Sequence, residues 1–222
     1  MDTIKQLDFT DEEIKDWMDK VDSLAASKDK TDNKNANPEF ACIVLAKIYK
    51  ESTHTSGGST IYIYATNMDG TISHYDIYLN AMLRYIDNPN NQLKVLVDSV
   101  PKLSKGRNAF KVVKDLLKVD KYKDRVQLKI VRSSQREEVK KLAAEYLRES
   151  HQYVHFAVSS ENAFRLEVNP ISHEATYSFH NPEKCKTLID LFTKLYKGEI
   201  SQNISDLGIT EVKLRHPQEA IE

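Results

Sequence analysis

The chain is poor in the residues from which common metal and nucleotide sites are built. Its only cysteines, Cys42 and Cys185, lie far apart in apolar helical patterns. We therefore expect two buried free thiols rather than a disulfide or a zinc site. The six glycines form no Gly-x-x-x-x-Gly-Lys loop, no Gly-x-Gly-x-x-Gly turn and no Gly-x-Ser-x-Gly elbow. We accordingly expect neither a cofactor nor a metal.

Long apolar stretches are also missing. No run of residues approaches the roughly 20 that a membrane-spanning helix needs. The opening Met-Asp-Thr-Ile-Lys lacks the apolar segment of a secretory signal. Charged residues make up 29% of the chain, and its 222 residues are enough to bury a real core. These features predict a globular cytoplasmic protein.

The net charge of −1 conceals two regions of opposite sign. Residues 1–39 contain six Lys and eleven Asp or Glu, whereas residues 102–148 contain fifteen Lys or Arg and six acids. The second region therefore has a net charge of +9. It could attract nucleic acid, an anionic lipid or an acidic partner, or it could be the ordinary solvated face of Lys-rich helices.

Residues 1–37 are predicted to form an N-terminal helical arm and a polar linker. Thr10 and Glu13 form a capping box, and apolar residues recur at helical spacing over residues 10–27. The polar residues 28–37 read as a linker. A short helix with one apolar stripe needs a packing partner, which could be its own domain, a second copy or another protein. We favour a second copy, with the interface formed by Trp17, Ile14 and Val21.

Residues 38–197 alternate between helical and strand patterns. Crossover units of this length indicate an α/β domain with a mixed, largely parallel sheet flanked by helices. The last three strands are joined by tight turns and should meander antiparallel. The tail, residues 198–222, is weakly patterned, with one short strand expected at Ile209–Leu214. The predicted strands are 60–66, 93–97, 126–131, 152–158, 163–168 and 174–179, and the predicted helices are 38–49, 72–87, 106–119, 134–148 and 182–197.

Three polar residues stand among alternating apolar ones in the predicted meander. Arg165 and Glu167 are two residues apart and so lie on one strand face, and His155 lies on the preceding strand. If the strands are neighbours, these side chains could form a phosphate-handling site with catalytic roles. Alternatively, His155 is a structural histidine, and Arg165 and Glu167 are an ion pair that anchors the strand.

Three further residues are candidates for ligand binding. Asp69 and Asp98 follow strands at their carboxyl ends, where open α/β sheets usually place ligands. Asn181 precedes Pro182 and Glu183 and is most simply a helix N-cap. Loop termination explains the two aspartates equally well.

The order of elements over residues 38–197 resembles one half of the phospholipase D-like fold. Active members of this family have His-x-Lys on a late strand, then an Asp and a Gly-Ser or Gly-Gly turn, and two such motifs face each other. Here His155 occupies the position of the nucleophile, but Ala157 stands where the Lys should be and Asn162 where the Asp should be. The chain also resembles bacterial relatives with a His-Phe-x-Val…Phe-Arg-x-Glu pattern, which lack the full motif.

The resemblance implies a degenerate, non-catalytic module that acts through protein contacts. It would be a homodimer or a subunit of a bacterial multi-component system, for example a defence system. One alternative is a dimeric phosphodiesterase or nuclease that uses His155 from each subunit, because no internal repeat supplies a second site. Another alternative is a nucleic-acid or anionic-ligand binder that uses residues 102–148.

Overall fold

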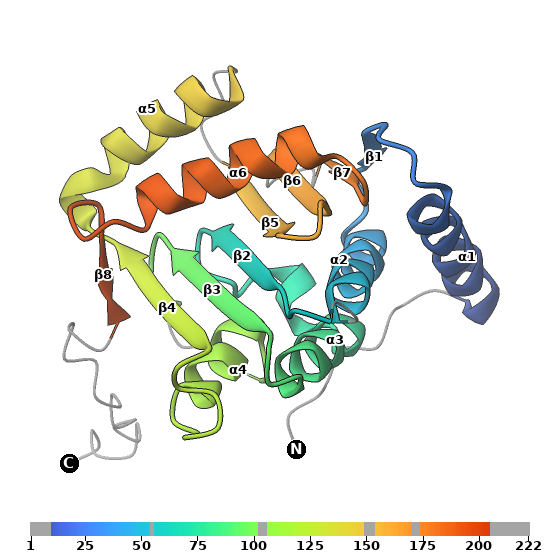
Figure 1. Ribbon diagram of the computed structural model, residues 1–222, viewed down its shortest axis with the longest axis horizontal. Coiled ribbons are helices and arrows are strands. Elements are labelled where there is room, and N and C mark those ends of the chain that lie inside the picture. Colours follow the sequence, from blue (N-terminus) through green and yellow to red (C-terminus); the bar gives the residue numbers. More distant parts are fainter. Residues whose placement is uncertain (1–9, 54–55, 102–105, 149–153, 170–173, 205–222) are drawn as a thin grey trace, which may run out of the picture.

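The computed structural model describes residues 10–53, 56–101, 106–148, 154–169 and 174–204. These residues form a three-layer α/β/α arrangement around one eight-stranded sheet (Figure 1). Strand order across the sheet is β1-β7-β6-β5-β2-β3-β4-β8. The strands are β1 (Asn33–Asn35), β2 (Thr60–Ala65), β3 (Gln92–Val97), β4 (Val126–Val131), β5 (His155–Ser159), β6 (Phe164–Asn169), β7 (Glu174–Ser178) and β8 (Ser201–Asn203).

The central strands pair as the sequence predicted. β2, β3 and β4 are parallel neighbours, and β5, β6 and β7 meander antiparallel. Among the described strands, two of the seven pairings are parallel, β2 with β3 and β3 with β4, and the other five are antiparallel. The sheet is therefore mixed, as expected, but less parallel than predicted. The linker and the tail each add a short antiparallel edge strand that side-chain patterns do not reveal.

Helices cover both faces of the sheet. They are α1 (Asp11–Ser27), α2 (Pro38–Thr53), α3 (Asp76–Asp87), α4 (Ala109–Leu116), α5 (Arg136–Leu147) and α6 (Pro182–Leu195), with short 3-10 turns η1 (Thr71–His74) and η2 (Ser133–Gln135). One apolar core joins α1, α2, α3 and α4 to one sheet face, and a second joins α5 and α6 to the other. Both cysteines are buried and free, as predicted.

The N-terminal helix packs on its own chain. Its capping box is present, since the Thr10 side chain accepts from the Glu13 amide and the Glu13 carboxylate accepts from the Thr10 amide. The Trp17 ring lies edge-on to Phe40 of α2, with 5.7 Å between centroids, and Val21 is fully buried. Ile14 packs against the same core.

Of the three packing partners that the sequence left open for the apolar stripe of α1, the structure shows its own domain. The stripe already has a partner in α2. Further contacts hold α1 in place: Lys47 Nζ lies 2.6 Å from Asp22 Oδ1, and His180 Nε2 lies 2.5 Å from the Ala25 carbonyl oxygen. An interface of Trp17, Ile14 and Val21 with a second copy stays a prediction, although these residues already pack on α2.

The linker and the tail extend the sheet. Residues 33–35 pair with β7, and residues 201–203 pair with β4. A sheet edge offers unpaired backbone groups, and even a polar segment such as Asn-Lys-Asn can satisfy them. The strand predicted at Ile209–Leu214 lies outside the described residues. In the part of the chain that the structure describes, no helix has the length and apolarity to cross a membrane.

Candidate functional site

The register between β5 and β6 gathers the predicted site residues. His155 is paired with Glu167, and Ala157 with Arg165. Residues two apart on a strand share a face, so all four side chains lie on one face of the sheet. Ala157 belongs to the core under α2, which identifies that face as the one covered by α2, α3 and α4. This confirms the prediction that Arg165 and Glu167 lie on one sheet face, with at least one of them within hydrogen-bond reach of another polar side chain.

A buried carboxylate joins the cation and the imidazole. Arg165 Nη1 donates to Glu167 Oε2 at 2.7 Å, and both side chains are only 5% exposed. Glu167 Oε1 lies 3.5 Å from His155 Nδ1, and the His155 side chain is 23% exposed. Glu167 therefore links a buried cation to the partly exposed ring of His155.

Burial raises the pKa of Glu167, but its hydrogen bond to His155 and the positive charge of Arg165 outweigh that effect and bring the pKa to about 2. The carboxylate consequently stays ionised at neutral pH. An ionised carboxylate only accepts hydrogen bonds, so His155 Nδ1 carries the proton between them.

Thr66 completes this network and was not identified from the sequence. Its Oγ1 lies 2.5 Å from His155 Nε2. The Thr66 hydroxyl can donate to this nitrogen or accept from it, so Thr66 and Glu167 contact the two nitrogens of the ring. Thr66 immediately follows β2 at its carboxyl end, and only the antiparallel pairing of β2 with β5 places it beside His155. The one sequence signal that could have identified Thr66 is its position, because it is a polar residue directly after a buried strand.

A cavity of about 250 Å³ adjoins the network. The four polar residues Thr66, His155, Arg165 and Glu167 contribute to its lining. Much of the remaining lining is apolar and comes from α2, from η1 and from the start of α3, including Leu45, Ile72 and Tyr78. Such a cavity, apolar with a few convergent polar groups at a strand end, is where a ligand site is expected.

Asp98 lies close to His155, but in a different cavity. It accepts a hydrogen bond from the Tyr64 hydroxyl at 2.7 Å. Its cavity, of about 370 Å³, is also lined by Arg136 and shares Thr66 and His155 with the first one. Burial raises the pKa of Asp98, partly offset by the Tyr64 hydrogen bond and by the charges of His155 and Arg136. Of the three proposed binding residues, Asp98 is the one associated with the His155 network.

Asp69 and Asn181 organise loops elsewhere. Asp69 Oδ1 accepts from Asn108 Nδ2 at 2.7 Å and lies 3.3 Å from His74 Nε2. Asn181 caps α6 by accepting from the Lys184 amide at 3.0 Å, and its Nδ2 donates to Asp32 at 2.9 Å. Both residues are therefore explained by local structure, which is the alternative that the sequence left open.

Asn162 lies in the turn between β5 and β6. Its φ of 72° is in the left-handed region, which asparagine tolerates better than most residues. Its carbonyl oxygen accepts from the Asn181 amide at 3.0 Å. This position therefore shapes a turn and ties it to the start of α6.

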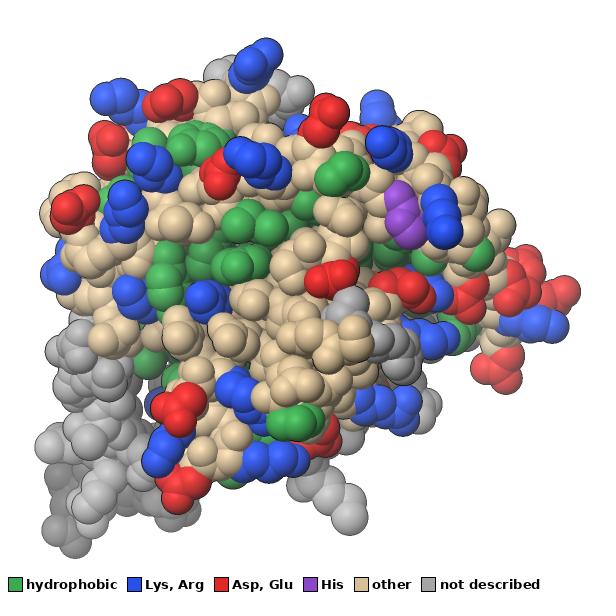
Figure 2. All heavy atoms as spheres, in the orientation of Figure 1, with side chains coloured by type: hydrophobic (Ala, Val, Ile, Leu, Met, Phe, Trp, Pro, Cys, Tyr) green, Lys and Arg blue, Asp and Glu red, His purple; other side chains and the backbone are tan. Residues whose placement is uncertain are grey.

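Some of the cations of region 102–148 contact nearby acids. Lys118, Lys121, Lys123 and Lys140 pair with Asp115, Asp87, Asp120 and Glu137 at 2.8 to 3.5 Å. On the face shown in Figure 2, basic and acidic side chains are interspersed.

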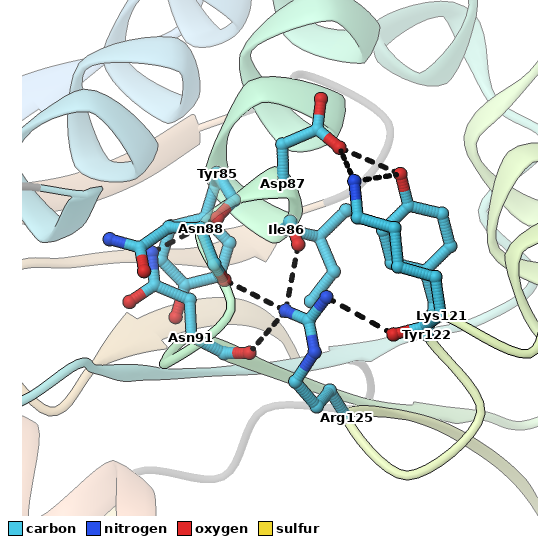
Figure 3. Close-up of polar contacts among 8 residues, drawn as sticks. All are labelled: Tyr85, Ile86, Asp87, Asn88, Asn91, Lys121, Tyr122 and Arg125. Atoms are coloured by element: carbon cyan, nitrogen blue, oxygen red, sulfur yellow. Dashed lines mark hydrogen bonds and ion pairs between the residues drawn. The ribbon is translucent and has the colours of Figure 1, made fainter.

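Arg125 is part of a structural clamp in this region. Its Nη1 lies within 2.8–3.1 Å of the carbonyl oxygens of Ile86, Asn88 and Asn91 (Figure 3). The guanidinium therefore holds the start of β4 against the turn that follows α3.

Within the described residues, no group of three His, Cys, Asp or Glu side chains could hold a metal ion. Comparison of the chain with models of protein families and with curated proteins found no match to either.

Proposed function

We propose that this chain is a phospholipase D-like module that binds rather than catalyses. Two features support the proposal: the order of strands and helices, and the position of His155 at the start of the first meander strand. The observation that carries it is the network around Glu167, in which Arg165 and His155 both contact one carboxylate.

Phosphodiester transfer to an imidazole needs a cation that offsets the charge developing on the phosphate oxygens. Ala157 supplies none, and it stands directly opposite Arg165 in the sheet. Arg165 is only 4% exposed and is bound to Glu167. If it moved away from Glu167 to reach a phosphate, it would leave a buried carboxylate without its cation, which costs about 3–5 kcal/mol. Loss of one hydrogen-bond donor to the transition state typically costs about 3 kcal/mol of transition-state stabilisation.

The test is turnover of a generic phosphodiester, bis-p-nitrophenyl phosphate, and of single- and double-stranded DNA. We expect the wild type, His155→Ala and the control His74→Ala to be equally inactive, with and without a chelator. His74 is a suitable control because it contacts Asp69 rather than the network. Turnover that His155→Ala abolishes and His74→Ala retains would refute the proposal.

One observation favours the alternative, a dimeric phosphodiesterase or nuclease. Glu167 lies where a carboxylate would orient the imidazole for attack through Nε2. That reading requires Thr66 to release Nε2 and a second copy to supply the facing histidine. Its signature would be a specific activity that rises with protein concentration as dimers form.

The proposal also includes contact with a second copy or a partner protein, because sites of this fold occur in facing pairs. Light scattering at micromolar concentrations measures the homodimer directly. Binding of nucleic acid or an anionic ligand through residues 102–148 remains an alternative, although at least four of these fifteen cations contact acids. Salt-dependent retention of the protein on heparin would support this alternative.

A further inference from the structure

A groove between helices α1 and α3 lies apart from the His155 network. Helix α2 packs against both of these helices and contributes lining residues between them (Figure 1). The groove has a volume of about 600 Å³. Its apolar lining comes from all three helices and consists of Met18, Val21, Ile43, Ala46, Ile77 and Ala81.

Met18 stands on the α1 side of this groove and is exposed to solvent. It is 44% exposed, whereas its neighbour Trp17 packs on Phe40. Within the described residues, Met18 and Val119 are the two large apolar side chains that are left exposed. Methionine adapts its shape to irregular apolar surfaces and is common at binding surfaces. An exposed methionine beside an apolar groove therefore marks a surface for protein contact.

The two sides of the groove carry opposite charges. Helix α1 contains six acids and two lysines, a net charge of −4, and Figure 2 shows acidic side chains gathered where α1 lies. The residues that α2 and α3 contribute to the groove include three cations, Lys47, Lys50 and Arg84, and no acid. Lys47 is already paired with Asp22 and Glu51. Lys50 and Arg84 form no ion pair with any residue that the structure describes, so they are available to acids of a partner.

From these observations we infer that a second copy of this chain docks on the groove, with the two copies related by a two-fold axis. In such an interface every contact occurs twice, so the acidic α1 of each copy meets the basic α3 side of the other. Met18 of each copy enters the apolar groove of the other. A partner with charges of one sign would be repelled by one side of the groove, whereas a second copy complements both sides. The inference rests on the proposed function for its protein contact and names the partner.

The first experiment is sedimentation velocity of the full chain over a range of micromolar concentrations. We expect a dimer whose fraction rises with concentration. Met18→Asp should weaken it by at least about 30-fold, the scale of an interface hot spot. Val119→Asp, the matched change at the other exposed apolar side chain, should leave it unchanged. A monomeric wild type, or a dimer that Met18→Asp does not weaken, would refute the inference.

Charge reversal tests the two-fold arrangement. Asp19, beside Met18 on α1, and Arg84 on α3 represent the two sides of the groove. Asp19→Lys and Arg84→Glu should each be monomeric, because like charges then meet at both contacts. An equimolar mixture of the two variants should form a heterodimer, because opposite charges meet again at both contacts. Lys141→Glu, an exposed reversal on α5, should dimerise like the wild type.

A mixture that stays monomeric would overturn the assignment of a second copy to this groove. Thermal unfolding of each variant verifies that it is folded, and the substituted side chains are exposed. The two proposals fail separately. Phosphodiester turnover would refute the absence of catalysis and leave the dimer standing, whereas a monomeric wild type without turnover would refute the dimer alone.

Discussion

Two acid–cation clusters in this molecule use the same chemistry in opposite surroundings. In the first, Glu167 contacts Arg165 and the ring of His155. In the second, Asp87 accepts from Lys121 Nζ at 2.8 Å and from the Tyr122 hydroxyl at 2.7 Å (Figure 3). Each has one carboxylate, one cation and one ring. Side chains of the buried ion pair are 5% exposed, whereas those of Asp87 and Lys121 are 58% and 57% exposed.

Exposure to solvent, rather than geometry, is expected to determine how much each ion pair contributes to stability. Water screens the exposed pair and competes for its groups, so such pairs contribute little to stability. The buried groups have given up hydration and depend on each other. We therefore expect only the buried cluster to lose much stability when one partner is removed. The contacts with Glu167 and Thr66 hold the His155 ring in one orientation.

The largest effect expected is from Arg165→Met. This change leaves Glu167 buried without its cation and should lower the free energy of unfolding by about 3–5 kcal/mol. Urea denaturation of the wild type and the variant measures it. The double variant Arg165→Met/Glu167→Leu should recover much of the loss, because no charge then remains buried. A double variant as unstable as the single one would show that packing, not charge, explains the effect.

A pH dependence should follow from Glu167. Its folded pKa of about 2 lies below the ordinary 4.5, so its contribution is fully present above about pH 4.5. That contribution is lost as the pH falls toward 2, and it amounts to about 3 kcal/mol. The stability of Glu167→Gln should change less than that of the wild type across this window. Parallel stability profiles for the two proteins between pH 5 and 2 would contradict the cause assigned here.

The Arg125 clamp should be intermediate, since it is partly buried and contacts carbonyl oxygens rather than a carboxylate. We expect Arg125→Met to cost about 2 kcal/mol, the scale of hydrogen bonds from a charged donor. Arg125→Lys should recover only part of this cost, because an ammonium lacks the planar fork. Full recovery with lysine would mean that charge alone matters at this position.

The smallest effect should come from the exposed cluster. Asp87→Asn should change stability by less than about 1 kcal/mol, and the change should shrink further in 1 M salt. A loss comparable to that of Arg165→Met would remove the distinction between the two clusters.

Much of the fold could be predicted from the sequence because its signals are local. The β-branched runs, the Thr10 capping box and the Asn181-Pro182 start of α6 each specify their element through neighbouring residues. The edge strands β1 and β8 could not be predicted, because their pairing depends on backbone groups at a distant sheet edge. The packing of Trp17 on Phe40 likewise depends on which surface lies within reach.

At the site, the sequence by itself determined that Arg165 and Glu167 share a face, because strand periodicity requires it. It also determined that Ala157 offers no cation. Only the tertiary structure decided that His155 contacts Glu167, that Thr66 is the second partner of the ring, and that Asp69 and Asn181 lie elsewhere. These contacts join residues on different strands and loops, and their register is set by the packing of the whole sheet rather than by the residues themselves.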